Sequence, residues 1–490
     1  MPLLSNLLAE MPIAANVEGD VAGVISDITT DSRAAHKGSM FVAIRGAKMD
    51  GHDYIAEAIK NGAEVIVMAR DCGIEIDAGL TAISVDNTRE ALAHLAAAFY
   101  GTQPSNVVAV TGTDGKTSTV DFARQLATLH GVKSASIGTL GVKCEDTDIM
   151  QQFAATHTSP DPLKLHALLK QLAQARISDV AIEASSHGLD QFRLDGVNLK
   201  AAAFTNFTRD HLDYHLTIDA YFAAKSRLFS ELLPKGALAI LNADDDRFLP
   251  LQEMCRKRNH TIISYGRNGV TLKIDAVKSH ALGLDAQVIV EGKAIRLTIP
   301  MYGEFQLYNM LAAVGLSHAF GMGLEESLVH CAQLKNVAGR MELVAQHNRG
   351  AAIFIDYAHT PAALQKLLEV TRQHITGKLV VVFGCGGDRD KGKRPLMGAI
   401  AKRLADVVVV TDDNPRSENP SDIRAEIMAQ CANAIEIGDR KQAIIAGLKT
   451  LEKNDALIVA GKGHETTQII GEQILHFNDA EIIREAVARL

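Results

Sequence analysis

The sequence predicts an α/β protein built from three domains. Its 490 residues exceed what one hydrophobic core holds, since domains average roughly 150 residues. Short apolar segments alternate with longer ones in which apolar residues recur at the spacing of an amphipathic helix. Polar and glycine-rich loops follow several of the short segments, as in parallel sheets that bind ligands at strand ends. We place the domains at residues 1–103, 104–337 and 338–490.

Composition narrows the class of protein. Apolar residues make up 47% and charged residues 22%, which is typical of a globular protein. The net charge of -8 argues against nucleic-acid binding. The six cysteines form no C-x-x-C pair, so we expect reduced core thiols and neither disulfides nor a zinc site. Without a basic signal-peptide start or an apolar run of about 18 residues, we expect a cytoplasmic monomer with no membrane span.

The first domain shows strand patterns at 21–28, 40–44, 63–68 and 80–85, and helix patterns at 54–61 and 88–100. The polar insert Thr30–Arg33 fits a substrate contact or an ordinary turn equally well. Gly101–Pro104 has the composition of a linker.

The segment Val107–Thr119 reads as a strand, a phosphate loop and the start of a helix. Gly112 and Gly115 let the backbone approach an anion, and the helix N-terminus faces it. Lys116 adds a positive charge, and the Thr117 hydroxyl can hold Mg²⁺. The pattern is a shortened G-x-x-G-K-T loop and predicts a bound nucleoside triphosphate. The alternative is a tight strand-to-helix turn with an exposed lysine.

Two further strands end in polar runs. Glu183 ends the strand that begins at Asp179, and the run Thr205–His215 follows a strand at 201–204. Carboxylates and imidazoles at strand ends suit a Mg²⁺ ion beside a triphosphate. Helix capping and surface polarity would explain the same residues without a ligand.

Lys225 falls inside the apolar stripe of a helix predicted at 218–233. Burying a bare ammonium costs several kcal/mol, so this lysine must reach solvent, pair or change its chemistry. A neutral lysine that reacts with CO₂ becomes a carbamate, an anion able to bridge metal ions.

The third domain repeats the strand–loop–helix pattern. Polar loops at 384–395, 412–416 and 461–465 each follow a predicted strand, which predicts a second ligand cleft. Arg389 and Arg416 offer planar guanidinium groups that suit carboxylates.

Four motifs, in this order, resemble those of the Mur ligases: Gly112–Thr117, Asp210–Asp213, Tyr221–Lys225 and Asp356–Pro361. The resemblance spans nearly the whole chain. It implies an N-terminal uridine-nucleotide domain, a central ATPase and a C-terminal Rossmann-like domain. With Ser185–Gly188 and Asp413–Arg416 added, the motifs resemble members that use ATP to join meso-2,6-diaminopimelate to UDP-N-acetylmuramoyl-L-alanyl-D-glutamate through an acyl phosphate, in peptidoglycan synthesis.

The resemblance also implies roles for particular residues. ATP and Mg²⁺ are expected as cofactors, Lys225 is expected to be carbamylated, and Lys116, Lys225 and His211 are the expected catalytic residues. The implied nucleotide contacts are Gly112, Thr113, Asp114, Gly115, Lys116, Thr117, Ser118, Asn309, Arg340 and Asp356. The implied metal ligands are Thr117, Glu183, His211 and Lys225.

The implied substrate contacts fall into three groups. Thr30 and Ser32 match uridine-nucleotide contacts. The muramoyl dipeptide would meet His157, Thr158, Ser159, Ser185, Gln191 and Arg193, although relatives often have asparagine in place of His157. The acceptor pocket would contain Arg389, Asp413, Asn414, Pro415, Arg416, Gly461 and Glu465. In that pocket Arg416 would bind the distal carboxylate, and Asp413 and Asn414 the ammonium side.

Three alternatives remain at this level. A member of the same family that adds L-lysine would be expected to lack Arg416. A folylpolyglutamate-synthetase-like ligase would share the phosphate loop but lack the acceptor pocket and the N-terminal nucleotide domain. A non-catalytic nucleotide-binding regulator would bind ATP without releasing ADP.

Overall fold

The structure, a computed structural model, describes residues 1–46, 49–153, 158–280 and 282–489. The chain forms two compact units: Met1–Lys273 with Asn309–Ser327, and Ile274–Tyr308 with Leu328–Leu490. Within the described ranges, no helix has both the length and the hydropathy needed to cross a bilayer. All six cysteines carry free thiols. The domain limits 1–103, 104–337 and 338–490 stay a prediction.

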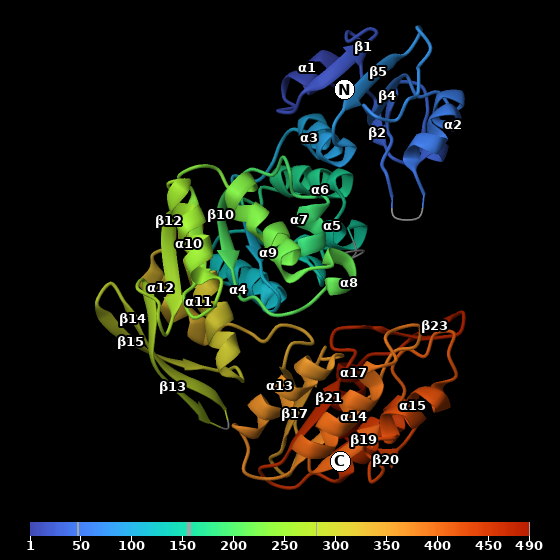
Figure 1. Cartoon of the computed structure of the whole chain (residues 1–490). Helices are drawn as coiled ribbons and strands as arrows, with labels where there is room; N and C mark the ends of the chain where they lie inside the picture. Colours follow the sequence, from blue (N-terminus) through green and yellow to red (C-terminus); the bar gives the residue numbers. More distant parts are fainter. Residues whose placement is uncertain (47–48, 154–157, 281, 490) are drawn as a thin grey trace. The chain divides into compact units, whose positions relative to one another are not determined.

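The first unit begins with a five-stranded sheet in the order β1-β5-β4-β3-β2, parallel except at β1 (Figure 1). Alternate residues of β4 face opposite sides, so Val65 and Val67 pack toward α1 and α3 while Ile66 packs toward α2. The elements are α1 (Leu4–Ala9), β1 (Ala15–Glu18), β2 (Asp27–Thr29), β3 (Ser39–Val42), α2 (Ile55–Lys60), β4 (Val65–Ala69), β5 (Thr81–Val85) and α3 (Thr88–Tyr100).

The predicted helix at 88–100 is confirmed, and its first turn is capped by the Asn87 side chain. The predicted strand at 21–28 is wrong over most of its length, because β2 begins at Asp27. The backbone before β2 pairs instead with the N-terminal segment, through the N–H groups of Leu4 and Ser5. The sequence interpretation also missed β1 (Ala15–Glu18).

The larger sheet of the first unit has the order β12-β11-β10-β6-β9-β7-β8, and only β7 and β8 pair antiparallel. Strand β6 lies between β9 and β10, at the point where the strand order reverses, which is where open α/β sheets bind ligands. The strands are β6 (Asn106–Thr111), β7 (Ser134–Gly138), β8 (Gly141–Lys143), β9 (Asp179–Glu183), β10 (Leu199–Phe204), β11 (Leu238–Asn242) and β12 (Thr261–Gly266).

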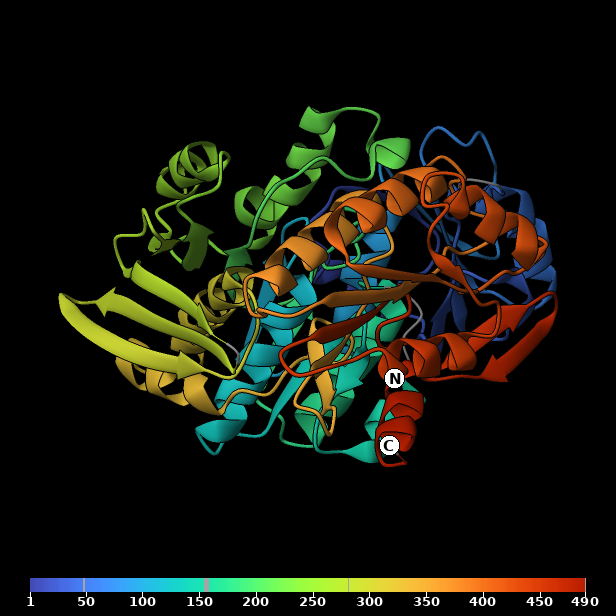
Figure 2. The same cartoon turned by 90° about the horizontal axis from the view of Figure 1, so that it is seen from below.

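The helices along these strands are α4 (Lys116–Leu129), α5 (Thr147–Gln152), α6 (Pro162–Gln174), α7 (Ser186–Asp190), α8 (Leu212–His215), α9 (Ile218–Arg227) and α10 (Phe248–Lys257). The helix predicted at 218–233 therefore consists of α9 and a π-helical turn at Leu228–Leu232. The chain continues through β13 (Leu272–His280), the antiparallel hairpin of β14 (Gly283–Val290) and β15 (Lys293–Ile299), drawn in yellow in Figure 2, and then α11 (Glu304–Ser317) and α12 (Leu324–His330).

The second unit contains a sheet in the order β16-β17-β21-β18-β19-β20, parallel except between β16 and β17. Val381 packs toward α13 and α14, whereas Val380 and Val382 pack toward α16 and α17, so helices cover both faces. The elements are β16 (Glu342–Gln346), β17 (Ala352–Asp356), α13 (Pro361–Arg372), β18 (Leu379–Phe383), α14 (Lys393–Leu404), β19 (Val407–Val410), α15 (Pro420–Met428), β20 (Ile435–Glu436), α16 (Arg440–Lys449), β21 (Ala456–Ala460), the hairpin β22 (Thr467–Ile470) and β23 (Gln473–His476), and α17 (Asp479–Val487).

Candidate active site

The phosphate loop lies between β6 and α4, and the segment that follows β10 holds it in place. The Thr205 hydroxyl donates to the carbonyl of Asp114 at 2.6 Å, and the Asp114 N–H donates to Asn206 Oδ1 at 2.9 Å. The Thr113 N–H donates to the carbonyl of Asn206 at 2.8 Å. Thr205 and Asn206, which follow the neighbouring parallel strand, thus hold the loop through three hydrogen bonds.

Both loop glycines adopt positive φ, at 145° for Gly112 and 85° for Gly115. A Cβ on Gly112 would lie 1.9 Å from Thr205 Oγ1, and one on Gly115 would lie 2.2 Å from Asn309 Oδ1. Glycine is therefore required at both positions. The same closeness places Asn309 of α11 against the loop.

Two lysines share one acceptor in this loop. Lys116 Nζ donates to the carbonyls of Gly112 and Thr113 at 3.0 and 2.7 Å, and Lys225 Nζ donates to the Gly112 carbonyl at 2.6 Å. Lys225 is only 1% exposed, and its Nζ lies 4.5 Å from the centre of the Tyr221 ring. Burial, and then the neighbouring charge of Lys116, lower the pKa of Lys225 well below its usual value. The lowered pKa shifts the equilibrium of Lys225 toward the neutral amine.

Glu183, the last residue of β9, is fully buried beside the end of β7. The Thr139 N–H donates to Oε1 at 2.8 Å, and the Thr139 hydroxyl donates to Oε2 at 3.2 Å. Thr139 also lies 3.1 Å from the Thr158 hydroxyl, a predicted substrate contact. The sequence interpretation missed Thr139, although it is a polar residue just after a strand of the same sheet.

A chain of hydrogen bonds leads from β9 to Arg193. Ser159 Oγ donates to the Glu183 carbonyl at 2.8 Å and lies 3.0 Å from Ser185 Oγ. Arg193 donates to the Ser159 carbonyl at 2.8 Å and to Gln191 Oε1 at 2.7 Å. Hydrogen bonds therefore join five of the predicted site residues: Glu183, Ser159, Ser185, Gln191 and Arg193.

A pocket of about 350 Å³ in the first unit contains three of the predicted substrate contacts, Thr30, Gln191 and Arg193. Arg89 and Asp161 also line it. The two arginines against one aspartate favour an acidic ligand. The sequence interpretation missed Arg89, which stands in the first turn of α3.

Two other predicted substrate or metal residues, Ser32 and His211, are not among those that line this pocket. Ser32 is buried and its hydroxyl donates to Glu57 Oε2 at 2.6 Å, so it does not line this pocket. His157 lies outside the described residues. His211 is exposed, has a φ of 51° and stacks edge-on against His187 at 4.9 Å. Burial, and then the neighbouring His211 and His215, lower the pKa of His187 to about 4.

Arg340 and Asp356 lie together in the second unit. The Arg340 guanidinium lies 4.9 Å from the centre of the Tyr357 ring. The Asp356 carboxylate accepts the N–H groups of Met341 and Ala358 at 2.6 and 2.7 Å. Asp356 therefore holds the backbone next to both Arg340 and Tyr357.

The loops after β18, β19 and β21 meet, as expected for neighbouring parallel strands. Asn414 Nδ2 donates to Glu465 Oε2 at 2.9 Å, and Arg416 donates to the Gly387 carbonyl at 2.8 Å. A Cβ on Gly461 would lie 2.7 Å from Asp413 Oδ2. We call the predicted acceptor residues in these loops the acceptor cluster: Arg389, Asp413, Asn414, Pro415, Arg416, Gly461 and Glu465.

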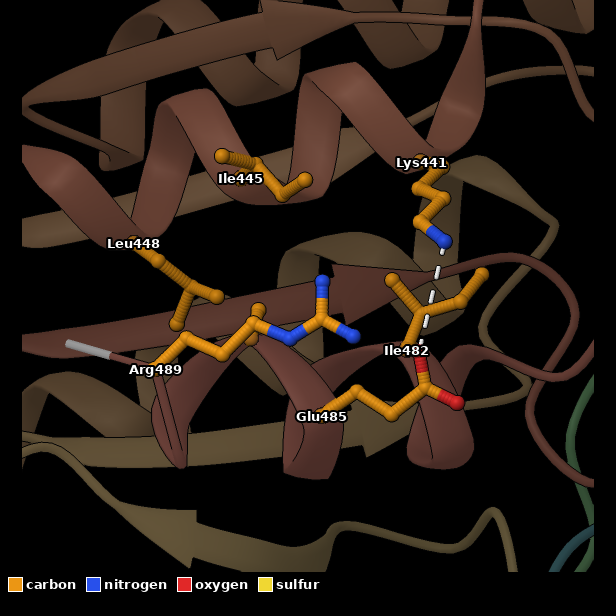
Figure 3. Close-up of a pocket in the computed structure, with 7 residues that line it drawn as sticks. Lys441, Ile445, Leu448, Ile482, Glu485 and Arg489 are labelled. Atoms are coloured by element: carbon orange, nitrogen blue, oxygen red, sulfur yellow. Dashed lines mark ion pairs between the residues drawn. The ribbon is translucent and has the colours of Figure 1, made fainter.

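A second pocket, of about 140 Å³, opens between α16 and α17 (Figure 3). Its floor is Ile445, Leu448 and Ile482, and a Lys441–Glu485 pair at 4.0 Å spans it. None of the predicted site residues lines it.

One group of three potential metal ligands, Glu90, His94 and Asp195, comes within 4.8 Å in the part of the chain that the structure describes. Arg227 already pairs with Asp195 at 2.7 Å, which leaves little net negative charge for a cation.

Comparison of the sequence with known protein families points to one family. Three Mur ligase profiles match in chain order: the family catalytic domain at 24–100, the middle domain at 110–317 and the glutamate ligase domain at 339–463. A Rhizobium meliloti protein named UDP-N-acetylmuramoyl-L-alanyl-D-glutamate--2,6-diaminopimelate ligase is 47% identical over 98% of this chain and 97% of its own. The chain belongs to the Mur ligase family.

Two other relatives of this Mur ligase carry the same name. The Brucella melitensis biotype 1 protein is 47% identical over 95% of each chain. A solved structure so titled has a TM-score of 0.73 at 28% identity, and the match covers 100% of this chain and 99% of that one. The predicted family and the three-domain α/β fold class of this Mur ligase are confirmed.

Proposed function

We propose that this chain is an ADP-forming ligase that joins meso-2,6-diaminopimelate to UDP-N-acetylmuramoyl-L-alanyl-D-glutamate in peptidoglycan synthesis. The proposal rests on relatives of that name at 47% identity over nearly the whole chain. The observation that carries it in the structure is the phosphate loop with Lys116 and Lys225 on one carbonyl. Segments 1–103, 104–337 and 338–490 would bind the uridine nucleotide, ATP and the amino acid respectively.

The loop fits a triphosphate. Its two glycines let the loop backbone pack closely against Thr205 and Asn309, and the first N–H groups of α4 have no acceptor within the helix. Lys116 supplies a positive charge at the loop for the transferred phosphoryl group. Thr113, Asp114, Ser118 and Asn309 would complete the nucleotide contacts of the first unit. Arg340 and Asp356 stay predicted nucleotide contacts.

Two of the predicted metal ligands, Thr117 and Glu183, offer the oxygen atoms that Mg²⁺ prefers, and His211 offers a nitrogen. Thr117 would offer its hydroxyl, Glu183 its carboxylate and His211 its imidazole. Mg²⁺ bound there would neutralise charge on the phosphates. Thr139 holds Glu183 through two hydrogen bonds, which fixes the direction in which the carboxylate faces.

Lys225 fits carbamylation. Only a neutral amine attacks CO₂, and the lowered pKa of Lys225 favours that form. The product is an anion, and Lys116, whose charge now opposes an ammonium at this position, would then attract the carbamate. One neighbour thus favours both the reactive amine and its product.

The chemistry follows from these positions. The D-glutamyl carboxylate attacks the γ-phosphorus of ATP, the bond from that phosphorus to the bridging oxygen breaks, and ADP leaves as the acyl phosphate forms. The diaminopimelate amine then attacks the acyl carbon, forms the amide and releases phosphate. The chain contributes orientation and charge neutralisation, with Lys116 at the phosphoryl group and Arg193 at the acidic dipeptide.

A ligation assay tests the proposal. Purified protein with ATP, Mg²⁺, the nucleotide dipeptide and meso-2,6-diaminopimelate should release one ADP for each tripeptide formed. L-Lysine in place of diaminopimelate should give little product, because the Arg416 guanidinium would then lack a distal carboxylate. Equal use of L-lysine, or ADP release without an amide product, would contradict the proposal.

Replacing Thr139 by valine should weaken Mg²⁺ activation. The change removes the hydroxyl donor to Glu183 Oε2 and keeps the backbone N–H bond, so the carboxylate loses part of its orientation. We expect the Mg²⁺ concentration for half-maximal activity to rise about tenfold. Thr128→Val is the matched control, since Thr128 is exposed on α4 and its hydroxyl bonds to the Arg124 carbonyl and to Ser134 Oγ. An unchanged Mg²⁺ requirement in Thr139→Val would exclude this role.

A further inference from the structure

We infer that Lys462 is a positioning residue for the acceptor amino acid, an inference that rests on the proposed function. Lys462 follows β21, and its side chain is 0% exposed. Its Nζ donates to Asn414 Oδ1 at 3.1 Å, to Glu465 Oε2 at 3.0 Å and to the Thr467 carbonyl at 2.6 Å. An ammonium has three N–H donors, so these three acceptors occupy all of them. Lys462 therefore acts through its neighbours and does not touch a ligand.

The contact with Lys462 fixes the orientation of the Asn414 amide. An ammonium can only donate, so the atom that faces it must be the amide oxygen. The Ile469 N–H donates to the same oxygen at 3.0 Å. Asn414 Nδ2 consequently points the other way, toward Glu465 Oε2 at 2.9 Å.

This orientation decides what Asn414 can offer an acceptor amino acid. Its oxygen already accepts two hydrogen bonds, and one N–H of Nδ2 goes to Glu465, so its remaining group is an N–H donor. A donor suits the carboxylate of a zwitterionic head and not its ammonium. The expectation that Asn414 contacts the ammonium side therefore does not fit this bonding pattern.

Lys462 also fixes the orientation of the Glu465 carboxylate. Oε2 of Glu465 accepts from both Lys462 and Asn414, which directs its hydrogen-bonding capacity on that side into the protein. The Glu465 side chain is 31% exposed, so the carboxylate also reaches the surface and can meet an ammonium through Oε1. Lys462 thus fixes an N–H donor on Asn414 for the carboxylate of a zwitterionic ligand and a carboxylate oxygen on Glu465 for its ammonium.

The Lys462→Met variant tests this inference in the ligation assay with the full chain. Methionine is unbranched and only one atom shorter, and it removes all three donors, so the Asn414 amide can rotate and Glu465 loses its cationic partner. We expect the KM for meso-2,6-diaminopimelate to rise at least about tenfold, the effect of leaving buried acceptors unpaired. The KM values for ATP and the nucleotide dipeptide should stay within about twofold, and the preference for diaminopimelate over L-lysine should fall. Lys462→Arg, which keeps the charge and donors, should recover part of the KM.

Lys449→Met is the matched control, because Lys449 is exposed at the end of α16 in the same unit. An unchanged diaminopimelate KM in Lys462→Met would overturn the inference, and so would a parallel rise of all three KM values. If Lys462→Met does not fold, Lys462→Met/Glu465→Gln removes the carboxylate left unpaired. Its KM for diaminopimelate should match that of Glu465→Gln alone, because both changes disrupt one arrangement; additive effects would overturn the inference. Absence of turnover in the unaltered protein would instead count against the proposed function.

Discussion

Lys225→Met is expected to reduce kcat about 100- to 1,000-fold, the size of effect seen when one preorganised electrostatic contact to the transition state is removed. The variant loses the carbamate proposed to help hold the metal beside the phosphate loop. Methionine fits the apolar stripe of α9, so packing is kept. Initial rates at saturating substrates measure the effect. Lys235→Met, an exposed lysine in the same unit, should retain full activity.

Stability measurements separate this loss from unfolding. The pKa of Lys225 is lower in the folded protein than its ordinary value of 10.5, which applies to the unfolded chain. At a pH between the folded and the unfolded pKa, the unfolded chain therefore binds more protons. Burying Lys225 therefore destabilises the folded state there, and this cost shrinks as pH rises toward 10.5. In CO₂-free buffer, Lys225→Met should melt at the same or a higher temperature than the unaltered protein near neutral pH. The difference should narrow at higher pH, and a large drop in melting temperature would contradict this account.

Carbon dioxide provides a second arm of the Lys225 experiment. Carbamate formation consumes a neutral amine and CO₂ and releases a proton, so activity should fall as pH decreases through the lowered pKa of Lys225. Removing CO₂ should also lower activity, and added bicarbonate should restore it. Lys225→Met should not respond to bicarbonate, although a short free carboxylate such as acetate should restore part of its activity. Equal bicarbonate responses in both proteins would rule out carbamylation of Lys225.

Arg416→Ala should abolish efficient use of meso-2,6-diaminopimelate. The guanidinium lies in the acceptor cluster, where it donates to the Gly387 carbonyl and can bind the distal carboxylate. Leaving that carboxylate unpaired should cost roughly 2–5 kcal/mol in kcat/KM. The KM for ATP should not change. Titrating each substrate separately measures both quantities.

Arg403→Ala is the control for Arg416, since Arg403 is an exposed arginine of the same unit that donates to Gln365. Near-normal diaminopimelate kinetics in Arg416→Ala would exclude this residue from acceptor recognition. Equal losses in the two variants would indicate a general effect of removing an arginine.

The backbone at Arg416 adds a constraint on which substitutions are informative. Arg416 has a φ of 52°, and the hairpin of β22 and β23 holds it through its own N–H and carbonyl. Any residue with a Cβ, arginine and alanine alike, is strained at such a φ by about 1–2 kcal/mol. Arg416→Asn, which tolerates this conformation better, should therefore show the same loss of diaminopimelate use with less loss of stability.

The local sequence was sufficient for the phosphate loop and for α3. The residues from Gly112 to Thr117 are contiguous, so their backbone conformation and the start of α4 follow from glycine placement and helix spacing. Lys225 was also predictable, because periodicity alone places it within the buried stripe of α9. Each feature depends on residues a few positions apart, whose geometry is fixed by the chain itself.

Tertiary structure decided the features that depend on which strands become neighbours. Thr139 and Glu183 are 44 positions apart, and Lys462 and Asn414 are 48 apart. No periodicity links such pairs, because their contact requires β7 beside β9, and β21 and β19 in one sheet. The strand predicted at 21–28 failed for the same reason, since its backbone found the N-terminal segment as a partner. The sequence determined which residue types stand at the strand ends, and strand order determined which of them touch, because hydrogen bonds act only between groups that the fold brings within about 3 Å.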